Sequence, residues 1–155
     1  MELYKAQEIV RDLFKKQSFS VLATQMDKQP YTSLVAFAST ADMRSLLFVT
    51  GLSTSKFMHI KKNPHVAMLI DNRLNNPQDV NRAAVVTVLG DVTAVRGEKR
   101  EDFCHIYLLK HPHLKDFLQA PSSVLLALMI RKIILVTKFQ QVVEWEVDNE
   151  SSMIK

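Results

Sequence analysis

The chain has 155 residues, 47 % hydrophobic and 23 % charged, as expected for one globular domain that buries a real core. Its net charge of +4 comes from lysines and arginines that run no longer than two together. This scatter favours phosphorylated small molecules as ligands over nucleic acid, which usually needs a basic stripe. A single cysteine excludes an internal disulfide and agrees with a reducing compartment. We predict one domain over residues 1–155, cytoplasmic and without a membrane span or an export signal.

The first elements are a helix and a hairpin. Apolar residues fall on one helical face over residues 3–16, which predicts a helix packed on something larger. Short and β-branched residues follow over 18–25 and 32–39 and predict two strands. We assign the turn between them to Asp27 and Pro30, which supply turn chemistry.

The next segment is the most informative one, because a strand over residues 46–50 runs into a hydroxyl-rich turn and a helix over 53–62. The first amides of that helix have no partner within it, and Lys56 adds a positive charge in the first turn. The hydroxyl donors of this turn are those of Thr50, Ser53, Thr54 and Ser55. A phosphate placed there would satisfy these groups together. The alternative is that Ser53 or Thr54 only caps the helix and Lys56 lies in solvent.

The rest of the chain reads mainly as sheet. A strand over 65–71 precedes a polar loop over 72–82, and a long strand over 83–95 follows, in which Gly90 predicts a bulge or bend. Helices are expected over 98–109 and 113–118, strands over 124–138 and 142–147, and a frayed tail over 148–155. Six or seven mostly antiparallel strands without strand–helix alternation predict a mainly β (α+β) barrel with flanking helices.

Other residues that could carry chemistry do not form a recognisable site. The spacing of Cys104, His105, His111 and His113 fits no tetrahedral metal pattern, so we predict no metal site. Glu144 and Glu146 share one face of a strand, where solvation is the simpler role. No nucleophile motif is present, and the sequence assigns no catalytic residue.

Five segments occur in a familiar order and spacing: PYTSLVAF, LLFVTGLSTSK, KKNPHVAMLIDNR, VVTVLGDV and VVEW. Together they resemble the FMN-binding split barrel of the pyridoxamine 5′-phosphate oxidase family, over residues 18–147. The resemblance implies a six- to seven-stranded antiparallel split barrel, a homodimer, and one FMN in each of two grooves between the chains. A flavin needs an apolar slot, backbone groups for its polar edge and a cationic pocket for its phosphate.

The resemblance also implies cofactor-binding positions. On the second strand these are Ser33, Leu34, Val35, Ala36 and Phe37. The ribityl chain and phosphate would lie against Val49, Thr50, Thr54, Ser55 and Lys56. Val85, Thr87 and Trp145 would approach the flavin from the partner chain. Trp145 could instead be a core-edge aromatic.

The alternation of the second strand also groups its side chains. Ser33 is in phase with Val35 and Phe37, so this face could line the groove, while Leu34, Ala36 and Ala38 take the other face.

Departures from the vitamin B6 enzyme change the expected activity. That enzyme has arginine where this chain has Ser33 and Ser55, and it continues beyond the tryptophan into a segment that grips the substrate phosphate. We therefore do not expect efficient oxidation of pyridoxine phosphate. Asp71, Asn72 and Arg73 are the polar candidates for replacing the lost contacts, although Arg73 could be a solvated loop cation.

Three function hypotheses follow. The first is an FMN-dependent oxidoreductase that acts on an unidentified small molecule with an unidentified electron donor. The second is a non-catalytic flavin- or haem-binding protein with a carrier, sensor, haem-utilisation or stress role. The third, a nucleic-acid-binding barrel, is disfavoured because no exposed aromatics alternate with basic residues. We expect a homodimer, because apolar strand faces such as residues 124–130 would otherwise be uncovered.

Overall fold

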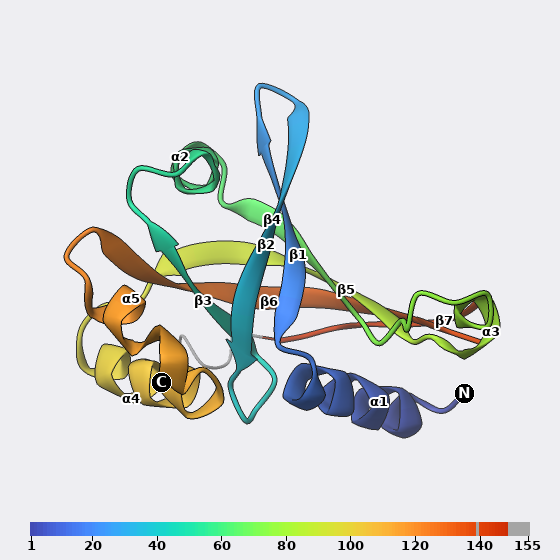
Figure 1. Cartoon of the computed structure of the whole chain (residues 1–155). Helices are drawn as coiled ribbons and strands as arrows, with labels where there is room; N and C mark the ends of the chain where they lie inside the picture. Colours follow the sequence, from blue (N-terminus) through green and yellow to red (C-terminus); the bar gives the residue numbers. More distant parts are fainter. Residues whose placement is uncertain (139, 149–155) are drawn as a thin grey trace.

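Seven antiparallel strands form one sheet, six of which close into a barrel, in the computed structural model that describes residues 1–138 and 140–148 (Figure 1). The strands are β1 (Phe19–Met26), β2 (Gln29–Ser39), β3 (Ser45–Gly51), β4 (His65–Asp71), β5 (Val85–Ala94), β6 (Ser123–Thr137) and β7 (Gln141–Glu146). Their order is β3-β2-β1-β4-β5-β6-β7, and a second pairing of β3 with β6 closes the ring. The predicted mainly β fold with six or seven antiparallel strands is confirmed.

Helices flank this barrel. They are α1 (Leu3–Lys16), α2 (Ser55–Lys62), α3 (Asp79–Arg82), α4 (Glu98–Lys110) and α5 (Lys115–Gln119), and a 3₁₀ turn (Pro112–Leu114) joins the last two. None of the helices in the described ranges is long and apolar enough to span a membrane. The predicted tail lies outside the described residues from residue 149 onward.

The barrel interior is the larger of two hydrophobic cores. Alternate residues of the strands point into it, among them the fully buried Leu22, Phe37, Phe48 and Met68. The apolar face of α1 packs on the same core through Ala6, Val10, Leu13 and Phe14. The packing face that the amphipathic pattern of residues 3–16 predicts is therefore confirmed.

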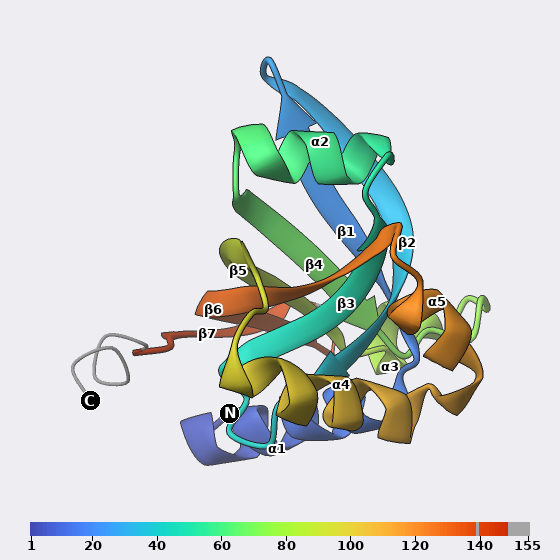
Figure 2. The same ribbon diagram turned by 90° about the vertical axis from the view of Figure 1, so that its left-hand side faces the viewer.

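A second core lies outside the barrel, between its β3–β6 wall and the helices α4 and α5 (Figure 2). Tyr107 is 1 % exposed there and donates a hydrogen bond to the Ala36 carbonyl at 3.1 Å. His111, at the end of α4, donates from Nε2 to the Phe37 carbonyl at 2.7 Å. These two bonds fasten α4 to β2.

This second core corrects one expectation. The apolar run 124–130 does not need a second chain to cover it, because β6 is buried on both sides within one chain. Leu126 and Leu128 face the barrel interior, whereas Leu125 and Ala127 face α4 and α5. A continuous apolar run is what a strand buried on two faces requires.

The first hairpin also differs from expectation. Its turn is formed by Asp27 and Lys28, both with positive φ (51° and 67°), as a two-residue hairpin loop of type I′ requires. Pro30 is not part of the turn but lies in β2, opposite Gln25. The hairpin extends past the barrel, where β2 has no neighbour besides β1, so the missing amide of Pro30 is tolerated.

The bulge predicted at Gly90 is present. The register between β5 and β6 shifts between Leu89 and Gly90, and the backbone of Met129 approaches Gly90 so closely that a Cβ there would lie 2.2 Å from its carbonyl oxygen. The glycine therefore permits a close contact between β5 and β6.

Candidate functional site

The junction between β3 and α2 is built around Thr54. This residue is the N-cap of α2, and its hydroxyl accepts the Phe57 amide at 3.3 Å. The same hydroxyl lies 2.9 Å from both the Thr50 hydroxyl and the Gly51 carbonyl. The capping role that we kept as an alternative is confirmed for Thr54, and the Thr50 and Thr54 hydroxyls are already occupied within the junction.

The groups that remain free to bind a ligand belong to the two residues that follow Thr54. Ser55 is exposed and Lys56 is half-buried, and neither side chain has a hydrogen-bond or ion-pair partner in the described part of the chain. The amides of these two residues are in the first turn of α2, where no carbonyl of the same helix can reach them. An anion at this end of α2 would meet one full positive charge and two backbone donors.

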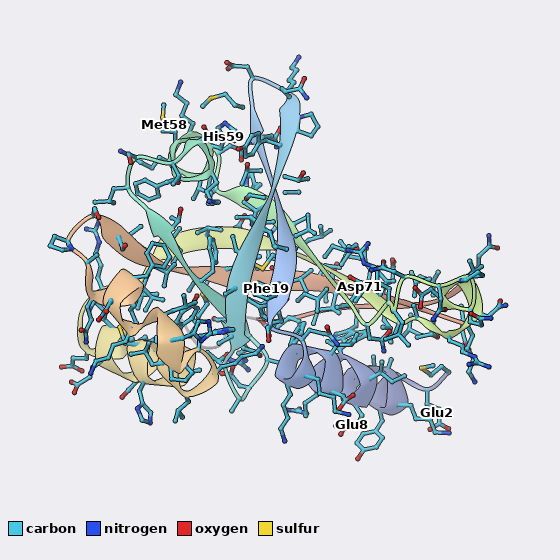
Figure 3. All side chains as sticks on the ribbon, viewed as in Figure 1. Glu2, Glu8, Phe19, Met58, His59 and Asp71 are labelled. Carbon is cyan, nitrogen blue, oxygen red and sulfur yellow. The ribbon has the colours of Figure 1, made fainter. Side chains whose placement is uncertain are left out.

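Helix α2 is held in place by His59, three residues after Lys56. His59 Nδ1 lies 2.9 Å from the Thr24 hydroxyl of β1, and its ring meets the edge of Tyr31 with centroids 5.0 Å apart. Figure 3 labels His59 on α2 beside the hairpin of β1 and β2. These contacts orient the helix, so the position of its first turn is set by tertiary packing.

The side chains of β2 divide as its alternation requires, but the faces are not those we expected. Val35 and Phe37 point into the barrel interior with 6 % and 0 % exposure, and the Ser33 hydroxyl on that side is buried without a described hydrogen-bond partner. The expectation that this face lines an open groove is therefore wrong for these side chains. The opposite face carries Leu34, which is 67 % exposed, and the half-buried Ala36.

Leu34 belongs to a row of side chains on the outer face of the sheet, the face turned away from the barrel interior. The register places these residues side by side across five strands: Leu34, Val21, Leu69, Thr87 and Ile134. The structure thus puts Leu34 and Thr87 on one surface, and Val85 lies on the same face of β5 two residues away. The side chain of Val49 is instead buried in the second core.

A cleft opens at one end of this outer face. Its walls include Phe19, Leu34 and Leu69, and its polar rim includes Asp71 and Arg73. Phe19 and Asp71 are labelled in Figure 3, at the ends of β1 and β4 next to α1. Phe19 and Leu69 were not among our candidates, although apolar residues on both faces of β1 and β4 were a signal that the outer face is apolar as well.

The polar candidates of the loop 72–82 are held by local contacts. Arg73 pairs with Asp71, with Nε and Oδ2 3.1 Å apart, while its side chain stays 57 % exposed, so it is a solvated cation with one ionic partner. The Asn72 side-chain oxygen accepts the Ala84 amide at 2.7 Å and closes the base of the loop. Asp79 accepts the amides of residues 74–76, and these bonds hold the pKa of its carboxyl below the usual range, the Leu74 amide most of all.

Trp145 lies apart from the other candidates. It is paired with Ile133, which is 1 % exposed, and packs on the barrel core beside α1. Thr87 shares its face of the sheet with Ile134 and Glu144, so Trp145 points to the other side. Within one chain the structure does not bring Trp145 together with Val85 and Thr87.

The described residues contain no group of three or more side chains able to hold a metal ion. Cys104 is partly buried against the second core, and His111 is used in fastening α4. The Nε2 atom of His111 is therefore already engaged by a backbone carbonyl.

A closed antiparallel barrel flanked by helices places the chain among the mainly β barrel proteins. The family model for pyridoxamine 5′-phosphate oxidase matches residues 6–136, and the chain belongs to this family. No curated protein matches the sequence.

Solved structures agree with this assignment. A haem-binding protein from Mycobacterium smegmatis has a TM-score of 0.81 at 14 % identity, over 91 % of this chain and 57 % of that protein. General Stress Protein 26 from Bacillus anthracis has a TM-score of 0.70 at 17 % identity, over 92 % and 98 %. A FAD-binding protein from Mesorhizobium loti has a TM-score of 0.66 at 15 % identity, over 87 % and 94 %. At such identities the likeness shows a common fold.

Proposed function

We propose that the protein is an FMN-binding flavoprotein, active as a homodimer, that oxidises or reduces a small molecule. The observation that carries the proposal is the start of α2, where Lys56 and two free amides converge without a described counter-ion. A phosphate monoester matches this set, because it carries charge for the lysine and several oxygen acceptors for the amides.

The outer face supplies what the flavin ring would need. Leu34 and Thr87 lie in one row of mostly apolar side chains, and a ring laid on this surface would be covered from the other side by a second chain. The buried side chains of Ser33, Val35 and Phe37 would leave only their backbone groups for the ring's polar edge. In this arrangement the protein contributes binding, orientation and electrostatics, and the flavin contributes the redox chemistry.

The phosphate contact is tested with two ligands and two variants. Lys56→Ala should weaken FMN binding about tenfold to a hundredfold, since a charge-assisted bond contributes roughly 1.5–3 kcal/mol, and should leave riboflavin binding unchanged. Lys62→Ala is the matched control, because Lys62 is an exposed lysine at the far end of α2. Flavin fluorescence titrations measure both ligands. Equal losses for FMN and riboflavin, or equal effects of the two variants, would place the phosphate elsewhere.

A second candidate function is non-catalytic binding of flavin or haem. The likeness to a haem-binding protein favours it, and so does His59, whose Nε2 has no described partner on the helix that carries Lys56. Absorption spectra separate the candidates: a flavin spectrum bleached anaerobically by reduced nicotinamide and restored by an acceptor supports an oxidoreductase. A Soret band lost in His59→Gln supports haem binding.

The departures at Ser33 and Ser55 give a further expectation for the reaction. Pyridoxamine 5′-phosphate should not bleach the flavin efficiently, because the cations that would orient the reacting carbon are absent at these positions. Rapid bleaching with formation of pyridoxal 5′-phosphate would contradict this expectation and would assign the vitamin B6 activity to this protein.

A further inference from the structure

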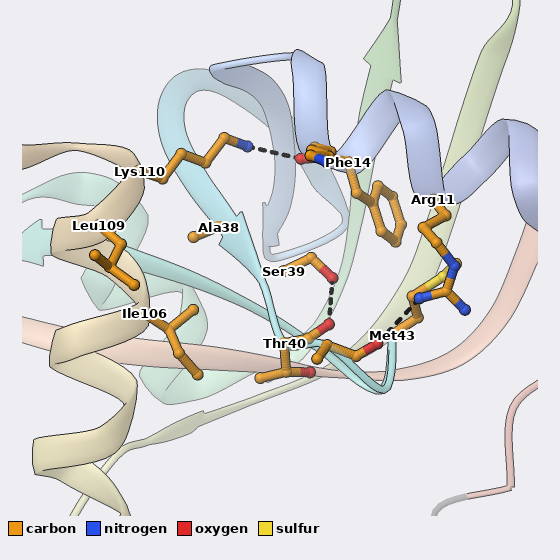
Figure 4. A pocket seen from close by; sticks show the side chains of 11 residues that line it. Arg11, Phe14, Ala38, Ser39, Thr40, Met43, Ile106, Leu109 and Lys110 are labelled. Carbon is orange, nitrogen blue, oxygen red and sulfur yellow. Dashed lines mark hydrogen bonds between the residues drawn. The ribbon is translucent and has the colours of Figure 1, made fainter.

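A cleft between α1 and α4, at the end of β2, gathers three cations around an apolar floor (Figure 4). Arg11 and Lys15 come from α1, and Lys110 comes from α4. Phe14, Ile106 and Leu109 supply apolar walls, and none of the lining residues is acidic. Its volume of about 350 Å³ suits a small molecule.

Lys110 is the central residue of this cleft. Its ammonium donates to the Phe14 carbonyl at 2.7 Å and lies 3.9 Å from the centre of the Phe37 ring. No carboxylate of the described residues pairs with it. Burial lowers the pKa of Lys110 to about 8, so the charged form lacks the stabilisation that an anion would give. Only one of the three ammonium protons has a hydrogen-bond acceptor in the described contacts.

The other charges leave the cleft positive. Arg11 donates to the Ala41 carbonyl at 3.1 Å, and its contact with Glu8 is a 3.5 Å pair between two half-exposed side chains, which screening makes weak. Asp42, beyond the rim, accepts the Thr40 hydroxyl and the Arg44 amide and is engaged by them. Figure 4 shows Arg11 and Lys110 on opposite sides of Ser39 and Thr40.

We propose that this cleft binds an amphipathic organic anion, with a carboxylate or phosphate group between Lys110 and Arg11 and an apolar body against Phe14, Ile106 and Leu109. The cleft shares no residue with the positions proposed for FMN, so this second site is independent of the flavin. The anion would supply the missing counter-charge, and the walls would release water from the apolar part.

Four probes separate the contributions of the charge and the apolar chain: octanoate, octyl phosphate, 1-octanol and inorganic phosphate. Calorimetric titrations of the whole protein, with and without FMN, should show binding of octanoate or octyl phosphate. The acid that binds more tightly identifies the head group. Comparable binding of 1-octanol would overturn the proposal, because the cleft would then be only an apolar crevice. The absence of binding by both acids would overturn it as well.

Variants test the lysine directly. Lys110→Met should weaken binding of the preferred acid at least about tenfold. Lys99→Met, an exposed change on the same helix, should leave the affinity unchanged. Because Lys110→Met could disturb the docking of α4, an NMR titration of the wild-type Lys110 side chain provides a second measurement. A bound acid should raise the pKa of Lys110, and an unchanged pKa at saturation would contradict the proposal.

Discussion

Gly90 shows how strongly a single backbone contact can constrain this barrel. Gly90→Ala should lower the free energy of unfolding by about 1–3 kcal/mol or more, because the new methyl group would lie 2.2 Å from the Met129 carbonyl oxygen, a backbone atom that cannot rotate away. Gly51→Ala is the control, since its methyl group would meet Thr54 at an ordinary 3.5 Å. Urea unfolding of both variants measures the difference. Equal stability of the two would show that β5 and β6 can separate at the bulge without cost.

At the level of single residues, the parts of the candidate site that depend on local chemistry could be predicted. The cap at Thr54 follows from residue type and position, and so does the positive charge at Lys56. The pairing of Arg73 with Asp71 and the tie between Asn72 and Ala84 depend on how the loop folds back on itself. Periodicity contains no information about such contacts.

Helix α4 depends on a buried histidine at its C-terminal end. Burial is the main cause that lowers the pKa of His111 below 6.5 in the folded protein. As the pH falls below 6.5, the His111 imidazole takes up a proton in the unfolded chain but not yet in the folded protein, where its pKa is lower. The free energy of unfolding should therefore decrease as the pH falls from 6.5 toward the pKa of the folded state. Above pH 6.5 His111 is neutral in both states, so its titration does not change the free energy of unfolding.

Two variants check this dependence. His111→Gln should flatten the decline in melting temperature between neutral and mildly acidic pH, whereas His105→Gln, an exposed histidine of the same helix, should keep the wild-type slope. A wild-type slope in His111→Gln would assign the acid sensitivity to other groups.

Most elements could be predicted from the sequence because each has a local pattern. The helix 3–16 and the strand 65–71 have the expected bounds, and the other strands differ mainly at their ends. The turn of the first hairpin was misplaced because Pro30 is a usual turn residue but lies here in an edge strand, where it is tolerated. The pairing of β1 with β2 instead places the turn at Asp27 and Lys28, which adopt positive φ.

At the scale of the whole molecule, the exposed outer face is the strongest reason to expect a dimer. Phe19, Leu34 and Val142 are 56 %, 67 % and 55 % exposed on this face. We predict that Leu34→Glu shifts the protein to monomers and weakens FMN binding, because a charge would be buried between two chains. Light scattering at micromolar concentration measures the mass of each form.

Leu109→Glu provides the control for that prediction, since Leu109 is 71 % exposed on α4 and is not part of the row of side chains that contains Leu34. It should stay dimeric. A wild-type monomer that binds FMN tightly would refute the proposed interface, and a dimeric Leu34→Glu variant would move the interface to another surface.

The sequence alone determined the strands, the helices other than α3 and the chemistry of the β3–α2 junction, because hydrophobic period, turn residues and capping groups act within a few positions. Tertiary structure decided which face of each strand is inside. Closure of β3 on β6 turned Val35 and Phe37 into the barrel, and α4 and α5 covered the run 124–130 that the sequence left without a partner. It also put Trp145 on the core side of β7 and brought Lys110 to Phe14, 96 residues away. Long-range pairing and burial set these relations, and no local pattern specifies them.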